Sequence, residues 1–152
     1  MPQFDLALQA DLSVRMLVAA IFGAAIGLER EIHEHPAGMR THLLVSLGSA
    51  IFTELSIYGF NGGPAPNGSL PTDTSRIAAQ IVSGIGFLGA GAILKSQKEG
   101  EITGLTTAAS VWLTAAVGIA AGMGREATAV LSAILALIIL SLLRRTESKR
   151  KG

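Results

Sequence analysis

Five long blocks of apolar residues, separated by short polar connectors, constrain the fold of this chain more than any other feature. The blocks cover residues 12–28, 43–60, 77–94, 105–123 and 127–143. Each would be about 26–28 Å long as an α-helix, which is close to the thickness of the hydrocarbon core of a bilayer. Backbone groups inside a bilayer must be satisfied within their own segment. We therefore predict an all-α, polytopic transmembrane helix bundle of about five spans, forming a single domain over residues 1–152.

Lysine and arginine are distributed unevenly between the two sides of these blocks. One side holds Arg15, Arg76 and Arg125, and the other holds Arg30, Arg40, Lys95, Lys98, Arg144, Arg145, Lys149, Arg150 and Lys151. Cytoplasmic connectors carry the excess of these residues in membrane proteins. We therefore predict an external N-terminus and a cytoplasmic C-terminus, with residues 144–152 as a short basic tail. In an alternative arrangement the first block is peripheral, and four spans remain.

The composition argues against several classes of function. The chain has no cysteine, which excludes disulfides, thiol nucleophiles and cysteine-ligated metals. Its net charge of +1 implies no nucleic-acid partner. No grouping of serine, histidine and aspartate suggests a hydrolase. We expect a protein that is not an enzyme and that holds no cofactor.

Small residues recur at four-residue spacing in several blocks, a pattern that allows membrane helices to pack closely. The first block has Gly23 and Gly27, the second has Ser46 and Ala50, and the fourth has Gly118 and Gly122. Three such faces exceed what five helices need internally, so we expect self-association, most simply as a homodimer. The third block is denser in glycine, which weakens a helix. Such a stretch can unwind where it lines a cavity.

Four polar residues are predicted to meet in the outer half of the membrane. Arg15, Glu54, Arg76 and Gln80 each lie on the small-residue or polar face of their block, at a similar depth. An unpaired charge at such a depth costs roughly 2.5–3.5 kcal/mol on insertion scales, so pairing is expected. Two interpretations stay open, a structural ion pair and a polar pathway through the bundle.

Two local patterns carry little weight. Gly84, Gly86 and Gly89 match the G-x-G-x-x-G dinucleotide fingerprint, but no strand precedes them and they lie inside an apolar block. The connector around His33 and His35 is rich in possible metal ligands, but its spacing matches no common site. We assign no metal ligands from the sequence.

Three stretches of the sequence resemble the MgtC/SapB family of bacterial inner-membrane proteins. They are GAAIGLERE with GMRTHLLVSLGSA (residues 23–31 and 38–50), RIAAQIVSGIGFLGAGAIL (76–94) and GLTTAASVWLTAAVGIAAGMG (104–124). The positions that match the family signature, besides Arg76 and Gln80, are Glu29, Arg30, Arg40, Thr41, Gly84, Gly86, Gly89, Gly91, Gly104, Thr106, Thr107 and Trp112. The resemblance implies about five spans in the inner membrane. Some members carry a soluble C-terminal domain, and here we expect the membrane domain alone.

The resemblance leaves two classes of function open. The family takes its name from an association with magnesium transport, which implies a transporter of magnesium, as ligand or substrate, or of another small ion. Other members resemble regulators that bind membrane proteins, such as the rotary ATP synthase or ion pumps, during adaptation to low magnesium. The only carboxylate within the blocks, Glu54, lies near two arginines, which makes a poor cation site in one copy.

Overall fold

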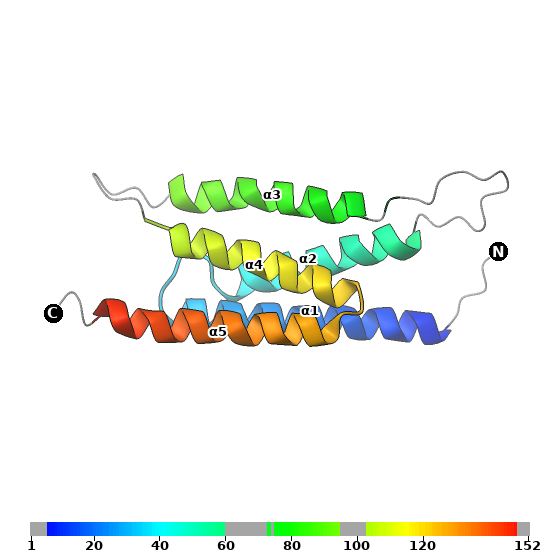
Figure 1. The fold of residues 1–152 in the computed structure, drawn as a ribbon, viewed down its shortest axis with the longest axis horizontal. Coiled ribbons are helices and arrows are strands. Elements are labelled where there is room, and N and C mark those ends of the chain that lie inside the picture. Colours follow the sequence, from blue (N-terminus) through cyan, green and yellow to red (C-terminus); the bar gives the residue numbers. More distant parts are fainter. Residues whose placement is uncertain (1–5, 60–72, 74, 95–102, 149–152) are drawn as a thin grey trace.

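The structure is a computed structural model that describes residues 6–59, 73, 75–94 and 103–148. Every element in these residues is a helix, as predicted (Figure 1). The elements are α1 (Leu6–Ile32), α2 (Met39–Glu54), the π-helix η1 (Leu55–Gly59), α3 (Ser75–Leu94), α4 (Leu105–Gly122) and α5 (Glu126–Ser148). Consecutive α-helices run in opposite directions, so the start of α1 and the end of α5 lie at opposite ends of the bundle (Figure 1).

Among the described residues, three helices are long and apolar enough to cross a membrane. They are α1, α3 and α4. The apolar part of α5, Glu126–Leu142, is somewhat shorter, and α2 has only 16 residues before η1 extends it. All five predicted blocks are therefore helical, and three of them have both the length and the apolar composition that a membrane span requires.

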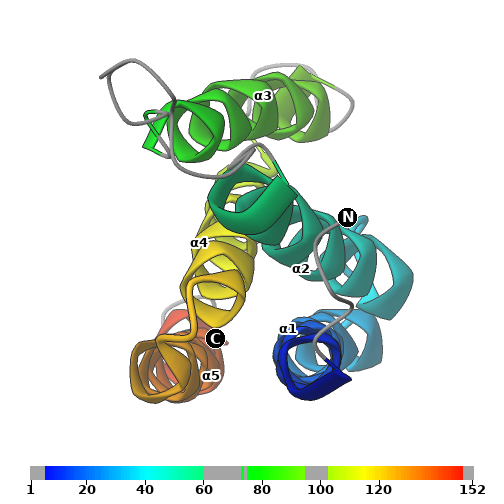
Figure 2. The same cartoon turned by 90° about the vertical axis from the view of Figure 1, so that its right-hand side faces the viewer.

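The helices form three layers (Figures 1 and 2). Helix α3 makes one outer layer, α2 and α4 make the middle layer, and α1 and α5 make the other outer layer. The core between the last two layers consists mainly of alanine, with Ala19, Ala50, Ala121 and Ala133 almost fully buried. Small side chains let these helices approach closely, which is how membrane helices gain packing energy.

Helix α5 shows this division along its length. Ala129, Ala133 and Ala136 are buried against the core, whereas Leu131 and Leu142 are exposed. The large side chains therefore face outward, where lipid would cover them.

The first connector is shorter than the sequence suggested, because α1 continues through Ile32. The chain then turns at Glu34, whose φ is 56°, and α2 begins after Gly38, which has no side chain to cap the new helix. Glu31 supplies the cap from across the turn, since its Oε2 accepts a 2.8 Å hydrogen bond from the backbone N–H of Met39. A carboxylate at a helix N-terminus accepts a hydrogen bond from a backbone N–H that has no partner within the helix, and its negative charge interacts favourably with the helix dipole.

The glycine-rich third block does not unwind. Helix α3 is continuous from Ser75 to Leu94. A glycine is needed instead at the start of α4, where Gly104 has a φ of 87° and a Cβ atom would lie 2.6 Å from the Ala92 carbonyl oxygen. This position explains physically why one signature residue of the family pattern must be glycine.

Candidate functional site

A column of polar side chains runs along the buried face of α2. His42, Ser46, Ser49 and Thr53 are spaced by four, three and four residues, and all are buried. This spacing places them on one face of a helix. The face lies against α1 and α4, so a line of polar groups runs through the otherwise apolar core of the bundle.

Helix α4 contributes hydroxyl groups that face this column. His42 Nε2 lies 3.0 Å from Ser110 Oγ, and His42 Nδ1 lies 2.9 Å from the Gly38 carbonyl oxygen. In a neutral imidazole the Nδ1–H therefore donates to Gly38, and Nε2 accepts. The single hydroxyl proton of Ser110 then has two acceptors, His42 Nε2 and the Thr107 carbonyl oxygen at 2.8 Å.

Glycines close the column on both sides. A Cβ atom on Gly23 of α1 would lie 2.7 Å from Ser46 Cβ, and one on Gly118 of α4 would overlap the Ser46 carbonyl oxygen. A Cβ atom on Gly122 would lie 2.6 Å from the Ala50 carbonyl oxygen. The backbones of α1, α2 and α4 are therefore in direct contact along the column.

The end of the column beside Arg15, which we call the outer end after the topology predicted from the sequence, holds a buried carboxylate. Glu54 is 6% exposed, and its Oε1 has no hydrogen-bond partner among the described residues. The charges of Arg15 and Asp11 act on it from α1. A buried carboxylate oxygen without a partner is costly, which makes this position a candidate for binding a ligand.

Arg15 joins three parts of the fold at this end. Its guanidinium forms an ion pair with Asp11, one turn earlier on α1. Its Nη1 donates to Tyr58 Oη at 3.1 Å and to the Gly122 carbonyl oxygen at 3.4 Å. The guanidinium also lies 5.8 Å from the centre of the Tyr58 ring, within cation–π range.

The π-helix η1 begins directly after Glu54. It covers Leu55–Gly59 and carries Tyr58, the partner of Arg15. π-Helical turns are rare and occur frequently at functional sites. The position of η1 beside the buried carboxylate therefore adds to the case for this end of the column.

The opposite end of the column, near the end of α1, carries a second charged cluster. Glu29 lies 3.4 Å from Arg30, which is 2% exposed, and Glu29 Oε1 lies 3.1 Å from His33 Nδ1. Burial lowers the pKa of His35 in the adjacent turn, and the charge of Arg30 lowers it further. Within the described part of the chain, no group of three or more metal-ligating side chains is found.

The structure places the four predicted polar residues in two different parts of the molecule. Arg15 and Glu54 lie together at the outer end of the column. Arg76 and Gln80 lie exposed on α3. In the described residues, neither of these two makes an ion pair or hydrogen bond with Glu54.

The signature positions of the family pattern are similarly divided. Arg30 and Thr107 are buried, and Gly104 is required by its backbone conformation. The exposed positions include Trp112, which is 50% exposed. The remaining exposed or partly buried signature positions are Glu29, Arg40, Thr41, Gly84, Gly86, Gly89, Gly91 and Thr106.

Sequence reasoning missed the column itself. It did not connect His42 with Ser49 and Thr53. The signal was present, because a histidine and three hydroxyl residues at helical spacing inside an apolar block mark one polar face. Asp11, the ion-pair partner of Arg15, was likewise signalled by its four-residue spacing.

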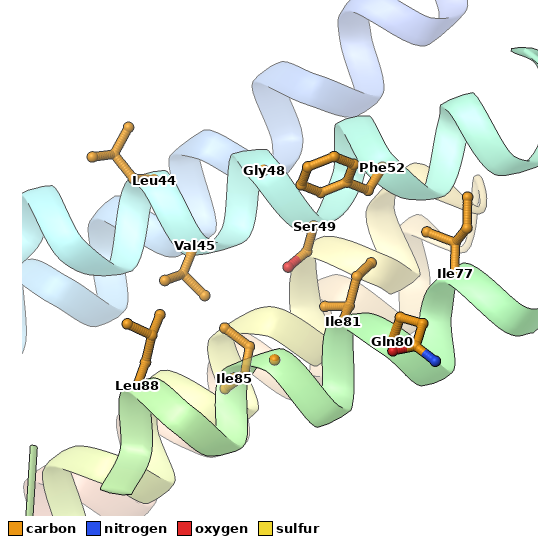
Figure 3. Close-up of a pocket in the computed structure, with 11 residues that line it drawn as sticks. Leu44, Val45, Gly48, Ser49, Phe52, Ile77, Gln80, Ile81, Ile85 and Leu88 are labelled. Carbon is orange, nitrogen blue, oxygen red and sulfur yellow. The ribbon is translucent and has the colours of Figure 1, made fainter. Parts of the chain in front are cut away.

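A second feature is an apolar groove between α2 and α3, with a volume of about 500 Å³ (Figure 3). Leucine, isoleucine, valine and phenylalanine side chains from the two helices face each other across it, and Gln80 lies along its α3 edge. The lining residues are Leu44, Val45, Gly48, Ser49, Phe52, Ile77, Gln80, Ile81, Gly84, Ile85 and Leu88.

Comparison with known proteins identifies the family of this chain. The model of the MgtC family matches residues 16–149, which include the polar column, Glu54 and the Glu29, Arg30 and His33 cluster, but not Arg15. The chain belongs to the MgtC family. No solved structure matches this MgtC family member.

Curated relatives of this MgtC family member come from several bacteria. The "Putative magnesium transporter YhiD" of Escherichia coli K12 is 43% identical over 131 residues, covering 86% of this chain and 60% of that protein. "Protein MgtC" of Salmonella typhimurium 14028s is 39% identical over 136 residues, covering 90% of this chain and 54% of that protein. This MgtC family member therefore spans little more than half the length of these relatives.

Proposed function

We propose that this chain is a magnesium-related protein of the bacterial inner membrane that moves a small ion, with Glu54 as the group that contacts the ion. The observation that carries the proposal is the buried Glu54 Oε1 without a hydrogen-bond partner among the described residues. Magnesium prefers oxygen ligands and is often bound through one or two carboxylates while it keeps several waters. Of the two arginines that the sequence placed near Glu54, only Arg15 lies close to it, and Arg15 is ion-paired with Asp11. The name of the YhiD relative supports magnesium as the ion.

A second oxygen on the same helix supports a path rather than an isolated site. Ser46 Oγ is also buried without a hydrogen-bond partner in the described part of the chain. It lies eight residues before Glu54 on α2, a separation of about 12 Å along the helix. Two unsatisfied oxygens on α2, at the middle and the outer end of the column, are suitable contacts for a partly hydrated ion.

Ion flux into liposomes tests this proposal. The purified protein is reconstituted into vesicles that contain a magnesium-sensitive dye, and magnesium is added outside. We expect wild-type vesicles to take up magnesium and Glu54→Gln vesicles to lose most of the flux. Glu126→Gln is the matched control, because Glu126 is an exposed carboxylate at the start of α5 and should leave the flux unchanged. Equal flux in wild-type and Glu54→Gln vesicles would refute the role of Glu54.

A second candidate function is regulation of other membrane proteins through helix contacts. The specific observation that favours it is the backbone contact at Gly23, Gly118 and Gly122, which leaves the column closed in this conformation. A regulator needs rigid packing and an outward surface rather than a passage. The liposome experiment separates the two functions, since a regulator gives no flux above that of empty vesicles for magnesium or other small cations.

The orientation in the membrane is part of the same proposal. The lysine and arginine bias favours a cytoplasmic C-terminus and an external N-terminus. Reporters fused after Arg145 and within residues 61–75 should be active on opposite sides of the membrane. Activity on the same side would contradict the five-span topology and remove the basis for calling Glu54 the outer end.

A further inference from the structure

Helix α3 is packed far less completely than the other membrane-length helices. Only 6% of the 18-residue apolar stretch of α3 is buried within the described chain, compared with 50% of the corresponding stretch of α4. Its single buried apolar side chain among the described core residues is Ile85. The groove of about 500 Å³ between α3 and α2 is bounded by apolar side chains on both walls (Figure 3).

The polar side chain of Gln80 distinguishes this exposed surface from an ordinary lipid-facing surface, which is apolar. Its side chain is exposed at the edge of the groove and has no hydrogen bond among the described residues (Figure 3). It lies five residues into α3, about 7.5 Å along the helix. An amide at that depth has little water to bond with, and glutamine is a residue that hydrogen-bonds across membrane helix contacts.

Small residues surround Gln80 in the geometry that close helix packing needs. Gly84 and Gly91 lie four and eleven residues after Gln80, which places all three on one face of α3. A Cβ atom on Gly84, on Gly91 or on Gly48 of the facing α2 would meet no atom within 4 Å. The glycines of this surface therefore serve no contact within the described chain, unlike Gly118 of α4.

We propose that α3 of a second copy of this chain lies in the groove between α2 and α3, related by a twofold axis along the membrane normal. The arrangement is reciprocal, because α3 of the first copy then lies in the partner's groove. The twofold axis brings Gln80 against the partner's Gln80 at the same depth. This inference does not rest on the proposed ion movement.

Self-complementarity identifies a second copy as the occupant. A glutamine amide contains both a donor and an acceptor, so two such groups across a twofold axis satisfy each other. Helix α3 carries no charged residue from Ile77 to Ile93, so two copies meet without repulsion within the apolar region. Arg76 lies one turn before Gln80, close to the helix start, where water and lipid headgroups separate the two charges.

The glycines of α3 provide a matched pair of variants. Gly84 lines the groove, whereas Gly86 does not, although a Cβ atom at either position would meet nothing within 4 Å. The Gly84→Leu variant should therefore prevent close approach of the second copy without disturbing the monomer. The Gly86→Leu variant adds the same side chain to the same helix, pointing away from the groove, and should leave association unchanged.

Association is measured by single-molecule photobleaching of the labelled protein in liposomes at increasing dilution. We expect a wild-type dimer, a loss of dimer in Gly84→Leu, and a dissociation constant about three- to tenfold larger in Gln80→Leu. Gln80→Asn should restore part of the affinity, because it keeps the amide. A wild-type protein that is monomeric at every density, with lipid or another protein in the groove, would overturn the proposal. So would equal loss of dimer in Gly84→Leu and Gly86→Leu.

Cross-linking gives a readout that does not depend on a bulky substitution. The chain has no cysteine, so single-cysteine variants report one position each. In native membranes the Gly84→Cys variant should form a disulfide-linked dimer on mild oxidation, and the Gly86→Cys variant should form much less. Preferential cross-linking through Gly86→Cys would place the contact on the other face of α3 and refute the groove.

Discussion

Helices α3 and α4 are both rich in glycine, yet their glycines have opposite roles. In α4, Gly118 and Gly122 lie against the backbone of α2, where no Cβ atom fits. In α3, a Cβ atom on Gly84, Gly86 or Gly91 would meet no atom of a neighbouring element within 4 Å. The same composition therefore produces a sealed internal contact in one helix and an unoccupied surface in the other.

The difference shows that small residues indicate close packing but not the partner. The polar residues beside the glycines follow the same division. On α4, Ser110 bonds to His42 across the interface, whereas Gln80 of α3 has no partner in the described residues. The α4 glycines therefore accompany a hydrogen bond across an internal interface, and the α3 glycines accompany an amide without a partner in the described residues, which is the basis of the dimer proposal.

The largest expected effect is on the α4 side of this comparison. Replacing Gly118 with leucine would drive the side chain into the Ser46 carbonyl oxygen, and we expect a loss of about 3 kcal/mol or more in stability. The measurement is the temperature at which the purified protein in detergent loses monodispersity. Gly86→Leu is the control and should melt no lower than wild type, because a side chain at this position meets no neighbour in the described chain. Equal destabilisation by both substitutions would remove the distinction between the helices.

A smaller effect is expected for the two arginines. Arg15 is tied to Asp11, Tyr58 and the Gly122 carbonyl, so Arg15→Gln should cost about 1.5–3 kcal/mol. Arg76→Gln on the exposed α3 should cost less than about 0.5 kcal/mol.

Double-mutant cycles with Glu54→Gln sharpen this contrast between the arginines. The effects of Arg15→Gln and Glu54→Gln should be non-additive, because the charge of Arg15 acts on Glu54. The effects of Arg76→Gln and Glu54→Gln should add to within about 0.5 kcal/mol. Coupling of Glu54 to Arg76 but not to Arg15 would contradict the structure.

A moderate effect is expected at the hydrogen bond between α2 and α4. Ser110→Ala removes the partner of His42 Nε2 and should cost about 0.6–2 kcal/mol, the range measured for interhelical hydrogen bonds in membranes. Ser83→Ala on the exposed surface of α3 is the matched control. If thermal melting in detergent shows the same loss for both, the column contributes nothing specific to stability.

The smallest effect has the opposite sign. Gly86→Ala fills open space on α3 and replaces a poor helix former, so the monomer should gain up to about 1 kcal/mol. Chemical denaturation followed by circular dichroism can detect this gain. A loss of stability would mean that Gly86 already contacts a neighbour that the described chain does not contain.

Most of the fold could be predicted from the sequence, because the bilayer leaves few alternatives to helices. The ends of α3 and α4 fall within two residues of the apolar blocks that predicted them. The extension of α1 to Ile32 was missed, since hydropathy stops at the charged Glu29 while helical hydrogen bonding does not. The offset position of α3 was also missed, because periodicity shows which face is small but not which neighbour covers it.

The candidate site was predicted only in part. Depth and helical face, which both follow from spacing along a straight helix, placed Arg15 and Glu54 at one level, and these two lie close together in the structure. The same reasoning grouped them with Gln80, because depth contains no information on lateral distance between helices. His42 was missed as an internal hydrogen-bonding residue because its partner, Ser110, is 68 residues away in sequence.

The π-helical turn at Leu55–Gly59 has a consequence for how this chain tolerates insertions and deletions. A π-helix has more residues per turn than an α-helix, so η1 contains more residues than an α-helix of the same length would. Deleting one residue within η1 would let the helix continue in regular α geometry and would cost little backbone hydrogen bonding. The deletion would nevertheless rotate Tyr58 away from Arg15 and leave the guanidinium without that partner. The number of residues in η1 therefore sets the direction in which Tyr58 points. A deletion here would break the contact between Tyr58 and Arg15 while the helix itself stayed intact.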